Sequence, residues 1–218
     1  MNADIITPVI PDRSFCLTDF GGIGDGRHDN TNAFARAIEA CTAAGGGTVI
    51  VPKGMWLTGS IKLASKLRLH LEKGAYIQFS VDYEKYPLIQ SAFEGRRTVR
   101  CQSPLDGESL EHVAITGDGI IDGAGHAWRP VKRDKLTASQ WRNLIKEGGA
   151  VENERIWWPT ESAMKGAETL ARLSGQETVS IEDYEQIKVF LRPNLLSLRN
   201  SKYILLDGPV FQNSPAWC

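Results

Sequence analysis

The sequence predicts an all-β fold, a right-handed parallel β-helix that carries an N-terminal capping helix and a helical insertion. The first observation is alternation: in residues 67–71 and 75–79, apolar side chains alternate with polar ones on either side of the Lys73-Gly74 turn. The second is repetition, because residues 112–123 and 203–213 have the same order of strand, polar-glycine corner and second short strand. A strand-corner-strand unit that recurs along a chain is typical of a solenoid, whose units bury their apolar faces by stacking.

A β-sandwich built from hairpins is the alternative architecture. It would place Asn-Gly or Asp-Gly in tight two-residue loops between matched strands. Asp-Gly pairs do occur, at residues 25–26, 106–107 and 122–123, but each adjoins a predicted loop or helix. The hairpin pattern is therefore weaker than the solenoid pattern.

The N-terminal region predicts one strand and one helix. Residues 15–20 are expected to form the first strand, followed by a glycine-rich segment. That segment has Arg27 where a Gly-x-Gly-x-x-Gly dinucleotide motif needs its third glycine, which disfavours a nucleotide site. Asp29 or Asn30 is predicted to cap a helix that ends at Gly45–Gly47. The apolar face of this helix suits it to cover the open end of a solenoid, and consists of Ala33, Phe34, Ala37, Ile38 and Cys41.

Residues 128–188 have a different pattern and are predicted to be a helical insertion. Thr137 to Gln140 form a capping box, and the helix that follows is expected to end at Gly148-Gly149. A second helix is predicted from near Thr160 to Gly175, and a short third helix from the looser capping box at residues 180–183. Insertions in solenoids often lie on the binding face, so this one is a candidate for binding.

The charge of the chain excludes several classes of partner. The 218 residues contain 25 Lys and Arg against 26 Asp and Glu, a formal net charge of −1. Such a chain has no long-range field to attract nucleic acid or an anionic membrane. No apolar run reaches the roughly 18 residues that suggest a transmembrane helix. The sequence therefore predicts neither a nucleic-acid partner nor a membrane partner.

Two further features concern the compartment and metals. Residues 1–8 lack the basic and apolar segments of a secretory signal peptide, so either the protein stays inside the cell or a leader has been removed. Four cysteines are widely separated and form no CxxC or CxH pair: Cys16, Cys41, Cys101 and Cys218. They are interpreted as small buried side chains or free thiols, and neither a metal nor an organic cofactor is expected.

Several blocks of the sequence, taken in order, resemble one known family. They are residues 19–26, 29–31, 45–49, 51–54, 57–61, 69–75, 115–123, 192–193 and 212–217. The first blocks resemble the N-terminal signature of pectin-lyase-like β-helix proteins. The whole series resembles the polygalacturonases, glycoside hydrolases that cut the galacturonate chains of pectin and are often extracellular or periplasmic. The resemblance implies a cell-wall-degrading hydrolase that acts on galacturonate-containing polysaccharides or oligosaccharides.

The resemblance also implies inverting hydrolysis, in which one carboxylic acid protonates the leaving oxygen while other carboxylates activate a water on the opposite face. The family's motifs for this chemistry are Asn-Thr-Asp, Asp-Asp, Gly-His-Gly and Arg-x-Lys. None occurs in these 218 residues, since residues 125–127 and 155–157 only approach the last two. No catalytic residue is therefore assigned. We expect residues 1–218 to be one β-helix domain, C-terminally incomplete and inactive by itself.

Three residues are candidates for binding sugar. Trp157 and Trp158 offer aromatic faces that stack on sugar rings, and the alternative is that they anchor the helices of the insertion. Arg192 offers a planar guanidinium for a galacturonate carboxylate, and the alternative is that it meets the last carbonyls of a helix.

The other titratable residues of the repeats are predicted to be structural. Glu72, Asp118 and Asp122 lie near glycine corners, where carboxylates usually accept hydrogen bonds from turn amides. His70, His112 and His126 have no partner motif beside them. Two rival functions stay open: a non-catalytic carbohydrate-binding relic, and a lyase or tail-spike protein on the same fold. The second would need calcium-binding carboxylate clusters or a trimer-forming C-terminus.

Overall fold

The computed structural model describes residues 6–93, 95–174 and 179–216, and the chain divides into two compact units. The coil unit comprises Met1–Lys85, Ser103–Gly123 and Leu195–Ser214. The lobe unit comprises Tyr86–Gln102, Ala124–Asn194 and Pro215–Cys218. The predicted organisation, a single domain with an insertion at residues 128–188, stays a prediction.

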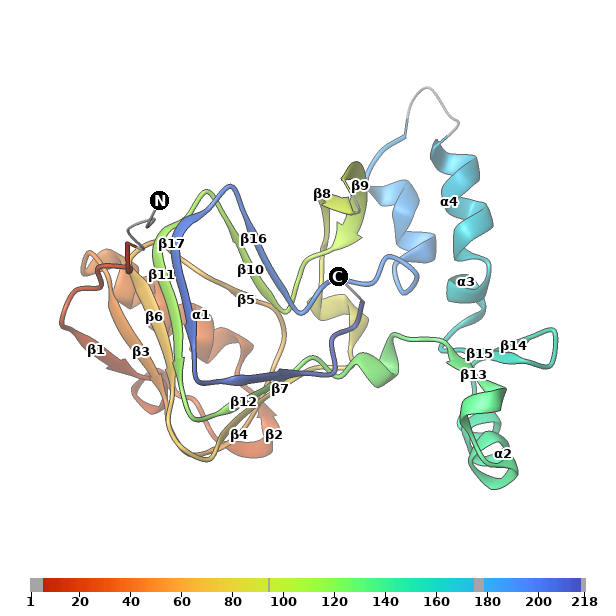
Figure 1. The fold of residues 1–218 in the computed structure, drawn as a ribbon, viewed down its shortest axis with the longest axis horizontal. Helices are drawn as coiled ribbons and strands as arrows, with labels where there is room; N and C mark the ends of the chain where they lie inside the picture. The colour runs from red at the N-terminus through yellow and green to blue at the C-terminus, as the bar shows by residue number, and fades with distance from the viewer. Residues whose placement is uncertain (1–5, 94, 175–178, 217–218) are drawn as a thin grey trace, which may run out of the picture. The chain divides into compact units, whose positions relative to one another are not determined.

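Three sheets of parallel strands make up the coil unit (Figure 1). The first sheet has the order β1 (Ser14–Cys16), β3 (Gly47–Val51), β6 (Leu67–Leu71), β11 (Glu111–Gly117) and β17 (Lys202–Asp207). The second has the order β18 (Val210–Gln212), β12 (Ile120–Asp122), β7 (Ala75–Phe79), β4 (Gly54–Thr58) and β2 (Asp25–Asp29). The third has the order β16 (Leu196–Arg199), β10 (Leu105–Glu108) and β5 (Ile61–Lys62). Strands from successive turns of the chain thus lie side by side and parallel, which confirms the predicted parallel β-helix.

The core of the coil unit consists of apolar side chains stacked in register. Val49, Leu69 and Ile115 pair from one strand to the next, and each is fully buried. Neighbouring strands lie about 4.8 Å apart, so these side chains contact one another directly. Burying one such side chain contributes about 1.5–3 kcal/mol. The alternation in residues 67–71 and 75–79 is therefore the alternation between the inside and the outside of the coil.

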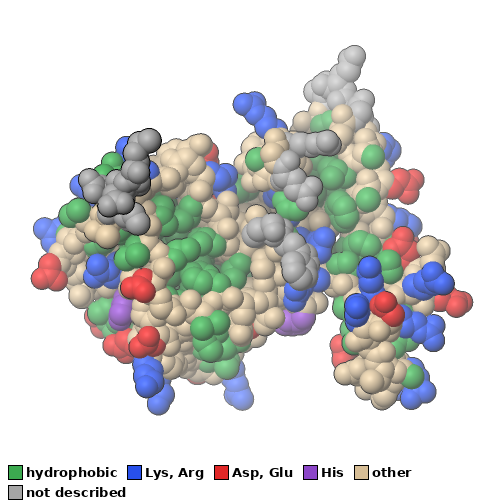
Figure 2. Space-filling model, in the orientation of Figure 1, with side chains coloured by type: hydrophobic (Ala, Val, Ile, Leu, Met, Phe, Trp, Pro, Cys, Tyr) green, Lys and Arg blue, Asp and Glu red, His purple; other side chains and the backbone are tan. Residues whose placement is uncertain are grey.

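The last coil leaves part of this core open. Leu206 of β17 pairs with Ile115 and continues its column, but 48% of Leu206 is exposed. Four further apolar side chains of this coil are only partly buried: Leu196, Leu198, Ile204 and Phe211. Figure 2 shows hydrophobic side chains gathered inside the triangle that β16, β17 and β18 form in Figure 1. Among the described residues, the stacking that buries the earlier coils is incomplete here.

The N-terminal helix α1 (Thr31–Ala43) packs against the first coil, as predicted. Its buried residues are Ala33, Phe34, Ala37, Ile38 and Cys41, all of which join the core of the coil unit. The prediction of a strand over residues 15–20 was wrong in part, because β1 ends at Cys16 and the 3-10 helix η1 (Leu17–Phe20) follows. The tighter 3-10 turn places Leu17 in the core, where it is fully buried. Gly21 ends this 3-10 helix with a φ of 80°, a conformation that glycine adopts without strain.

The lobe unit combines helices with two small antiparallel sheets. β8 (Leu88–Phe93) pairs with β9 (Arg96–Cys101), and β15 (Ile156–Trp158) pairs with both β13 (Val131–Lys132) and β14 (Ala150–Glu152). The α-helices of this unit are α2 (Ala138–Lys146), α3 (Glu161–Met164) and α4 (Gly166–Ser174). Its 3-10 helices are η3 (Gly125–Ala127), η4 (Arg133–Lys135) and η5 (Glu182–Ile187), while η2 (Tyr83–Lys85) belongs to the coil unit.

The predicted helices of residues 128–188 correspond to α2, to α3 with α4, and to η5. Thr137 caps α2 in the predicted capping box, with its side chain accepting from the Gln140 amide. The second helix is broken at Lys165, and the next residue explains why: a Cβ on Gly166 would lie 2.1 Å from the ring of Phe190. The glycine that this contact requires also weakens the helix. The third helix is of the 3-10 type. Residues 175–178, where the second helix was predicted to end, lie outside the described residues.

The described residues contain neither a membrane-spanning helix nor a metal-binding cluster. None of their helices is long and apolar enough to cross a membrane. No group of three or more His, Cys, Asp or Glu side chains within the described ranges is arranged to hold a metal ion. Cys16, Cys41 and Cys101 are free thiols, and Cys218 lies outside the described residues.

Candidate functional site

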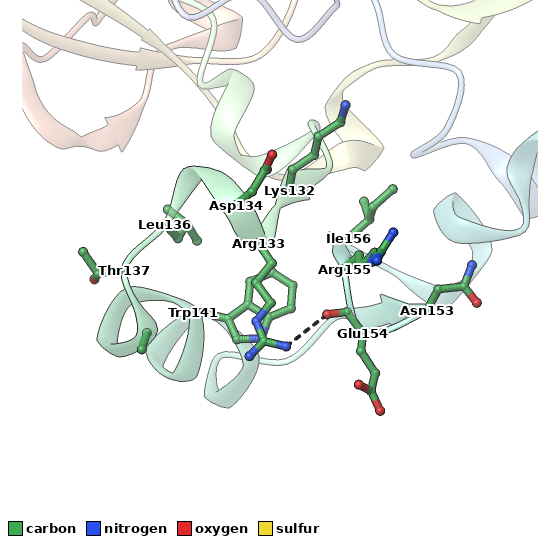
Figure 3. Close-up of a pocket in the computed structure, with 11 residues that line it drawn as sticks. Lys132, Arg133, Asp134, Leu136, Thr137, Trp141, Asn153, Glu154, Arg155 and Ile156 are labelled. Carbon is green, nitrogen blue, oxygen red and sulfur yellow. Dashed lines mark hydrogen bonds between the residues drawn. The ribbon is translucent and has the colours of Figure 1, made fainter.

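The lobe unit contains a surface pocket of about 780 Å³ next to the strand that carries both predicted tryptophans (Figure 3). One wall comes from the segment that leads from β13 through η4 into α2, and the other from the turn between β14 and β15. The lining residues are Lys132, Arg133, Asp134, Leu136, Thr137, Ala138, Trp141, Asn153, Glu154, Arg155 and Ile156.

The capping box at the start of α2 shapes one wall of this pocket. The Thr137 amide donates to Gln140 Oε1 over 2.9 Å, which fixes where the helix begins. Trp141, one turn later, points inward and is only 7% exposed. The Arg133 guanidinium lies over the Trp141 ring, 6.0 Å from its centre, and donates to the Glu154 carbonyl over 3.5 Å (Figure 3). The arginine therefore links the two walls.

The opposite wall includes a strained turn. The Arg155 amide donates to the Glu152 carbonyl, and both residues between them have positive φ, 47° for Asn153 and 57° for Glu154. This is the geometry of a type I′ turn, in which the second central position strongly favours glycine. A glutamate there costs free energy, and local strain of this kind is commonest at functional sites.

Electrostatically, the pocket is mixed. Lys132, Arg133 and Arg155 contribute positive charge, whereas Asp134 and Glu154 contribute negative charge. None of the five forms an ion pair with another described residue. Charged and amide groups beside a largely buried indole suit a polar, hydroxylated ligand better than an apolar one.

The two predicted tryptophans lie on β15 and differ in exposure. Trp157 is 9% exposed, donates through Nε1 to the Gly148 carbonyl over 2.8 Å, and packs on Gly149, where a Cβ would come within 2.6 Å of its ring. Trp158 is half-buried, and its Nε1 donates to Glu152 Oε2 over 2.9 Å. Trp157 thus holds the end of α2 against the sheet, while Trp158 retains more surface for a ligand.

Arg192, the third predicted residue, is half-buried and lies in the same unit. Burial lowers the pKa of its guanidinium, and the positive charge of Arg129 lowers it further. The Arg192 side chain makes no hydrogen bond or ion pair with any other described residue. Sequence reasoning could not show this effect of Arg129 on the pKa of Arg192, because no motif connects two arginines that are 63 residues apart.

The coil unit contains a separate polar cluster around Asp122. This carboxylate is 5% exposed, and its Oδ2 accepts from Tyr76 (2.7 Å), Gln212 (2.8 Å) and Asn213 (2.7 Å). Burial raises the pKa of the Tyr76 hydroxyl, and its bond to Asp122 raises it further. The interpretation of Asp122 as a residue serving turn amides was incomplete, because it joins side chains from three successive coils. Three donors on one oxygen make it a structural acceptor rather than an acid or base.

Comparison with known proteins gives partial matches, and no family model matches the chain. A probable polygalacturonase of Vitis vinifera is 41% identical over 124 residues, which cover 53% of this chain and 25% of that protein. Plasmin and fibronectin-binding protein A of Streptococcus pneumoniae is 34% identical over 209 residues, which cover 95% of this chain and 25% of that protein. The chain spans about a quarter of the length of these curated relatives.

A solved structure matches nearly the whole chain. The exopolygalacturonase of Thermotoga maritima superposes with a TM-score of 0.74 and 32% identity, covering 98% of this chain and 45% of that one. Its parallel β-helix agrees with the stacked parallel sheets of the coil unit. The chain is therefore similar to part of the polygalacturonases and exopolygalacturonases, which belong to the wider group of parallel β-helix proteins.

Proposed function

We propose that the chain supplies sugar-binding surface to a pectin-degrading glycoside hydrolase of the polygalacturonase type. The observation that carries this is the similarity to an exopolygalacturonase over 98% of the chain at 32% identity. The ligand is a galacturonate-containing polysaccharide or oligosaccharide, and no metal or organic cofactor takes part.

The reaction in this proposal is inverting hydrolysis of the glycosidic bond. It needs a general acid and a water-activating carboxylate about 6.5–9.5 Å apart. The motifs that carry these groups in polygalacturonases do not occur in the 218 residues. Asp122, the most buried carboxylate of the second sheet, already accepts three hydrogen bonds. These residues thus contribute to binding, and the reacting carboxylates are not among them.

Trp158, Trp157 and Arg192 are proposed to contact the sugar. Aromatic faces stack on the apolar faces of pyranose rings, and a guanidinium pairs with the carboxylate at C6 of galacturonate. Arg192 is the strongest of the three, because its guanidinium is half-buried and has no protein partner among the described residues.

The first test is a reducing-end assay run beside a binding titration, both with purified 218-residue chain and oligogalacturonates. We expect saturable binding and no release of galacturonate above a boiled control. Release above that control would refute the assignment of binding without catalysis. Failure to bind any oligogalacturonate would refute the proposed function itself.

A non-catalytic binding protein is the second candidate. It is supported by the 34% identity, over 95% of the chain, to a protein named for binding plasmin and fibronectin. Surface-immobilised plasmin and fibronectin, tested against the same chain in parallel with oligogalacturonate, separate the two functions. Binding to either protein without binding to the sugar would favour this second function.

A further inference from the structure

We propose that His112 is a pH-sensitive anchor for the N-terminal arm, defined here as residues 6–13. The arm contains no helix or strand and leads into β1. Neutral His112 holds the far end of the arm, and protonation of the imidazole releases that end. The inference concerns the coil unit alone and does not depend on the proposed function.

The arm runs along the starts of three neighbouring strands of the first sheet. The Arg13 carbonyl accepts a hydrogen bond from a backbone amide of β3 over 2.7 Å, next to β1. Pro11 lies against Gly46, where a Cβ would come within 3.1 Å of the proline Cδ. The same Cβ would meet Lys66, the residue before β6. Four residues before Arg13, the arm reaches β11. It therefore crosses from the first complete coil to the third.

One hydrogen bond holds the far end of the arm. The Val9 amide donates to Nδ1 of His112 over 3.2 Å. No other hydrogen bond or ion pair joins residues 6–12 to the rest of the described chain. Val9 is 70% exposed, so burial of its side chain contributes little to holding it in place. The position of this end therefore depends on the acceptor at Nδ1.

The orientation of the His112 ring is fixed by its neighbours. The ring stacks on that of Tyr203 in β17, with centres 4.6 Å apart and planes 11° apart. His112 and Tyr203 have φ values of 58° and 59°, and Lys66 has 56°. The strand registers place these three residues at equivalent positions of successive coils. The repeated corner and the ring stacking together keep Nδ1 directed at the arm.

The charged groups at this corner give His112 no ionic partner. The titratable residues that the arm and the adjoining strands bring here are Asp12, Arg13, Lys66, Glu111, Lys202 and Tyr203. Glu111 pairs with Lys202 over 2.9 Å, and the Lys202 ammonium lies 5.5 Å from the centre of the Tyr203 ring. No carboxylate of the described ranges forms an ion pair with His112. The hydrogen bond from Val9 is thus the specific interaction at Nδ1, and it requires the neutral ring.

The two protonation states of His112 have opposite effects on this bond. In a neutral imidazole with its proton on Nε2, Nδ1 has a lone pair and accepts the Val9 proton. In an imidazolium both ring nitrogens carry protons, so Nδ1 would face the Val9 N–H as a second donor. Histidines change charge between about pH 5 and pH 8. The bond is therefore present toward pH 8 and lost toward pH 5.

NMR of the isotope-labelled 218-residue chain between pH 8 and pH 5 tests the anchor. The chemical shifts of the Val9 amide and of the His112 ring proton on Cε1 should change with the same midpoint. The exchange protection of the Val9 amide, corrected for the intrinsic rate at each pH, should fall about three- to tenfold in acid, as the loss of one hydrogen bond implies. The Leu69 amide in the core of the coil unit should keep its protection, because the coils stay folded.

Three variants isolate the anchor. His112→Asn places an oxygen acceptor that does not titrate near the position of Nδ1, and asparagine tolerates positive φ, as Asn200 does at 50°. This variant should keep Val9 protected at both pH values. Val9→Pro removes the donor and leaves His112 in place, so the arm should be released at both pH values. His28→Gln, at an exposed histidine of β2, is the matched control and should behave as the wild type does.

Two results would overturn the anchor. The first is constant protection of the Val9 amide in the wild type while His112 titrates. The second is a loss of protection in His112→Asn as large as that in the wild type, which would assign the effect to another group. If His112→Asn does not fold, the wild-type titration and the comparison with Val9→Pro decide the question, because neither changes the histidine.

Discussion

At the residue scale, the structure distinguishes polar side chains that stabilise the fold from those that remain available for a ligand. Asp122 accepts three side-chain hydrogen bonds and connects successive coils. Arg192 lies among protein atoms with no partner for its guanidinium among the described residues. The sequence could suggest Arg192, because it belongs to an Arg-Pro pair with a family resemblance, but not that its side chain is half-buried, which depends on the folded lobe unit.

Asp29 provides a prediction about pH at this scale. Burial raises the pKa of this carboxyl, but hydrogen bonds from Lys85 and Thr31 outweigh that effect and lower the pKa to about 2. A depressed pKa in the folded state means that the contribution to stability is complete above the ordinary value of 3.8 and is lost as the pH falls toward 2. Since 42% of the Asp29 side chain is exposed, we expect the contribution to be about 1 kcal/mol or less.

Urea unfolding between pH 7 and pH 2 measures this contribution. Asp29→Asn should lower stability at pH 7 and should differ less from the wild type as the pH approaches 2. A constant difference across the range would contradict the assignment of the pKa shift to the folded state. Glu147→Gln, on an exposed carboxylate at the end of α2, serves as the control.

At the scale of elements, patterns that repeat were predictable and single short elements were not. The strands of the coil unit alternate with period two over five residues and recur, so both their existence and their inward faces follow from the sequence. β13, β14 and β15 have only two or three residues each and lie between helices, which gives no period to detect. The break between α3 and α4 depends on Phe190, a tertiary contact that no local pattern contains.

The β14–β15 turn provides the prediction at this scale. Glu154→Gly should raise the free energy of unfolding by about 0.5–1 kcal/mol, because glycine adopts positive φ without steric strain. The greater backbone entropy that glycine loses on folding offsets only part of this stabilisation. Denaturant titration checks the change. Glu147→Gly, at a φ of −73°, should destabilise instead. A stabilising effect at residue 147, or a destabilising one at residue 154, would contradict the turn geometry.

At the scale of the whole molecule, the fold could be predicted, whereas the assembly of the binding groups could not. A solenoid repeats one unit, so a single sequence reveals its architecture once the repeat is recognised. The lobe unit has no such repeat, and its pocket arises where the segment before α2 meets the turn between β14 and β15. A net charge of −1 also means that an acidic glycan must be bound by local cations rather than by the field of the whole protein.

The most direct test of this account is a crystal structure of the 218-residue chain with trigalacturonate bound. The account predicts that a galacturonate carboxylate lies within hydrogen-bonding distance of Arg192, with an intact glycosidic bond. A sugar bound away from Arg192, or with its carboxylate exposed to solvent, would contradict it.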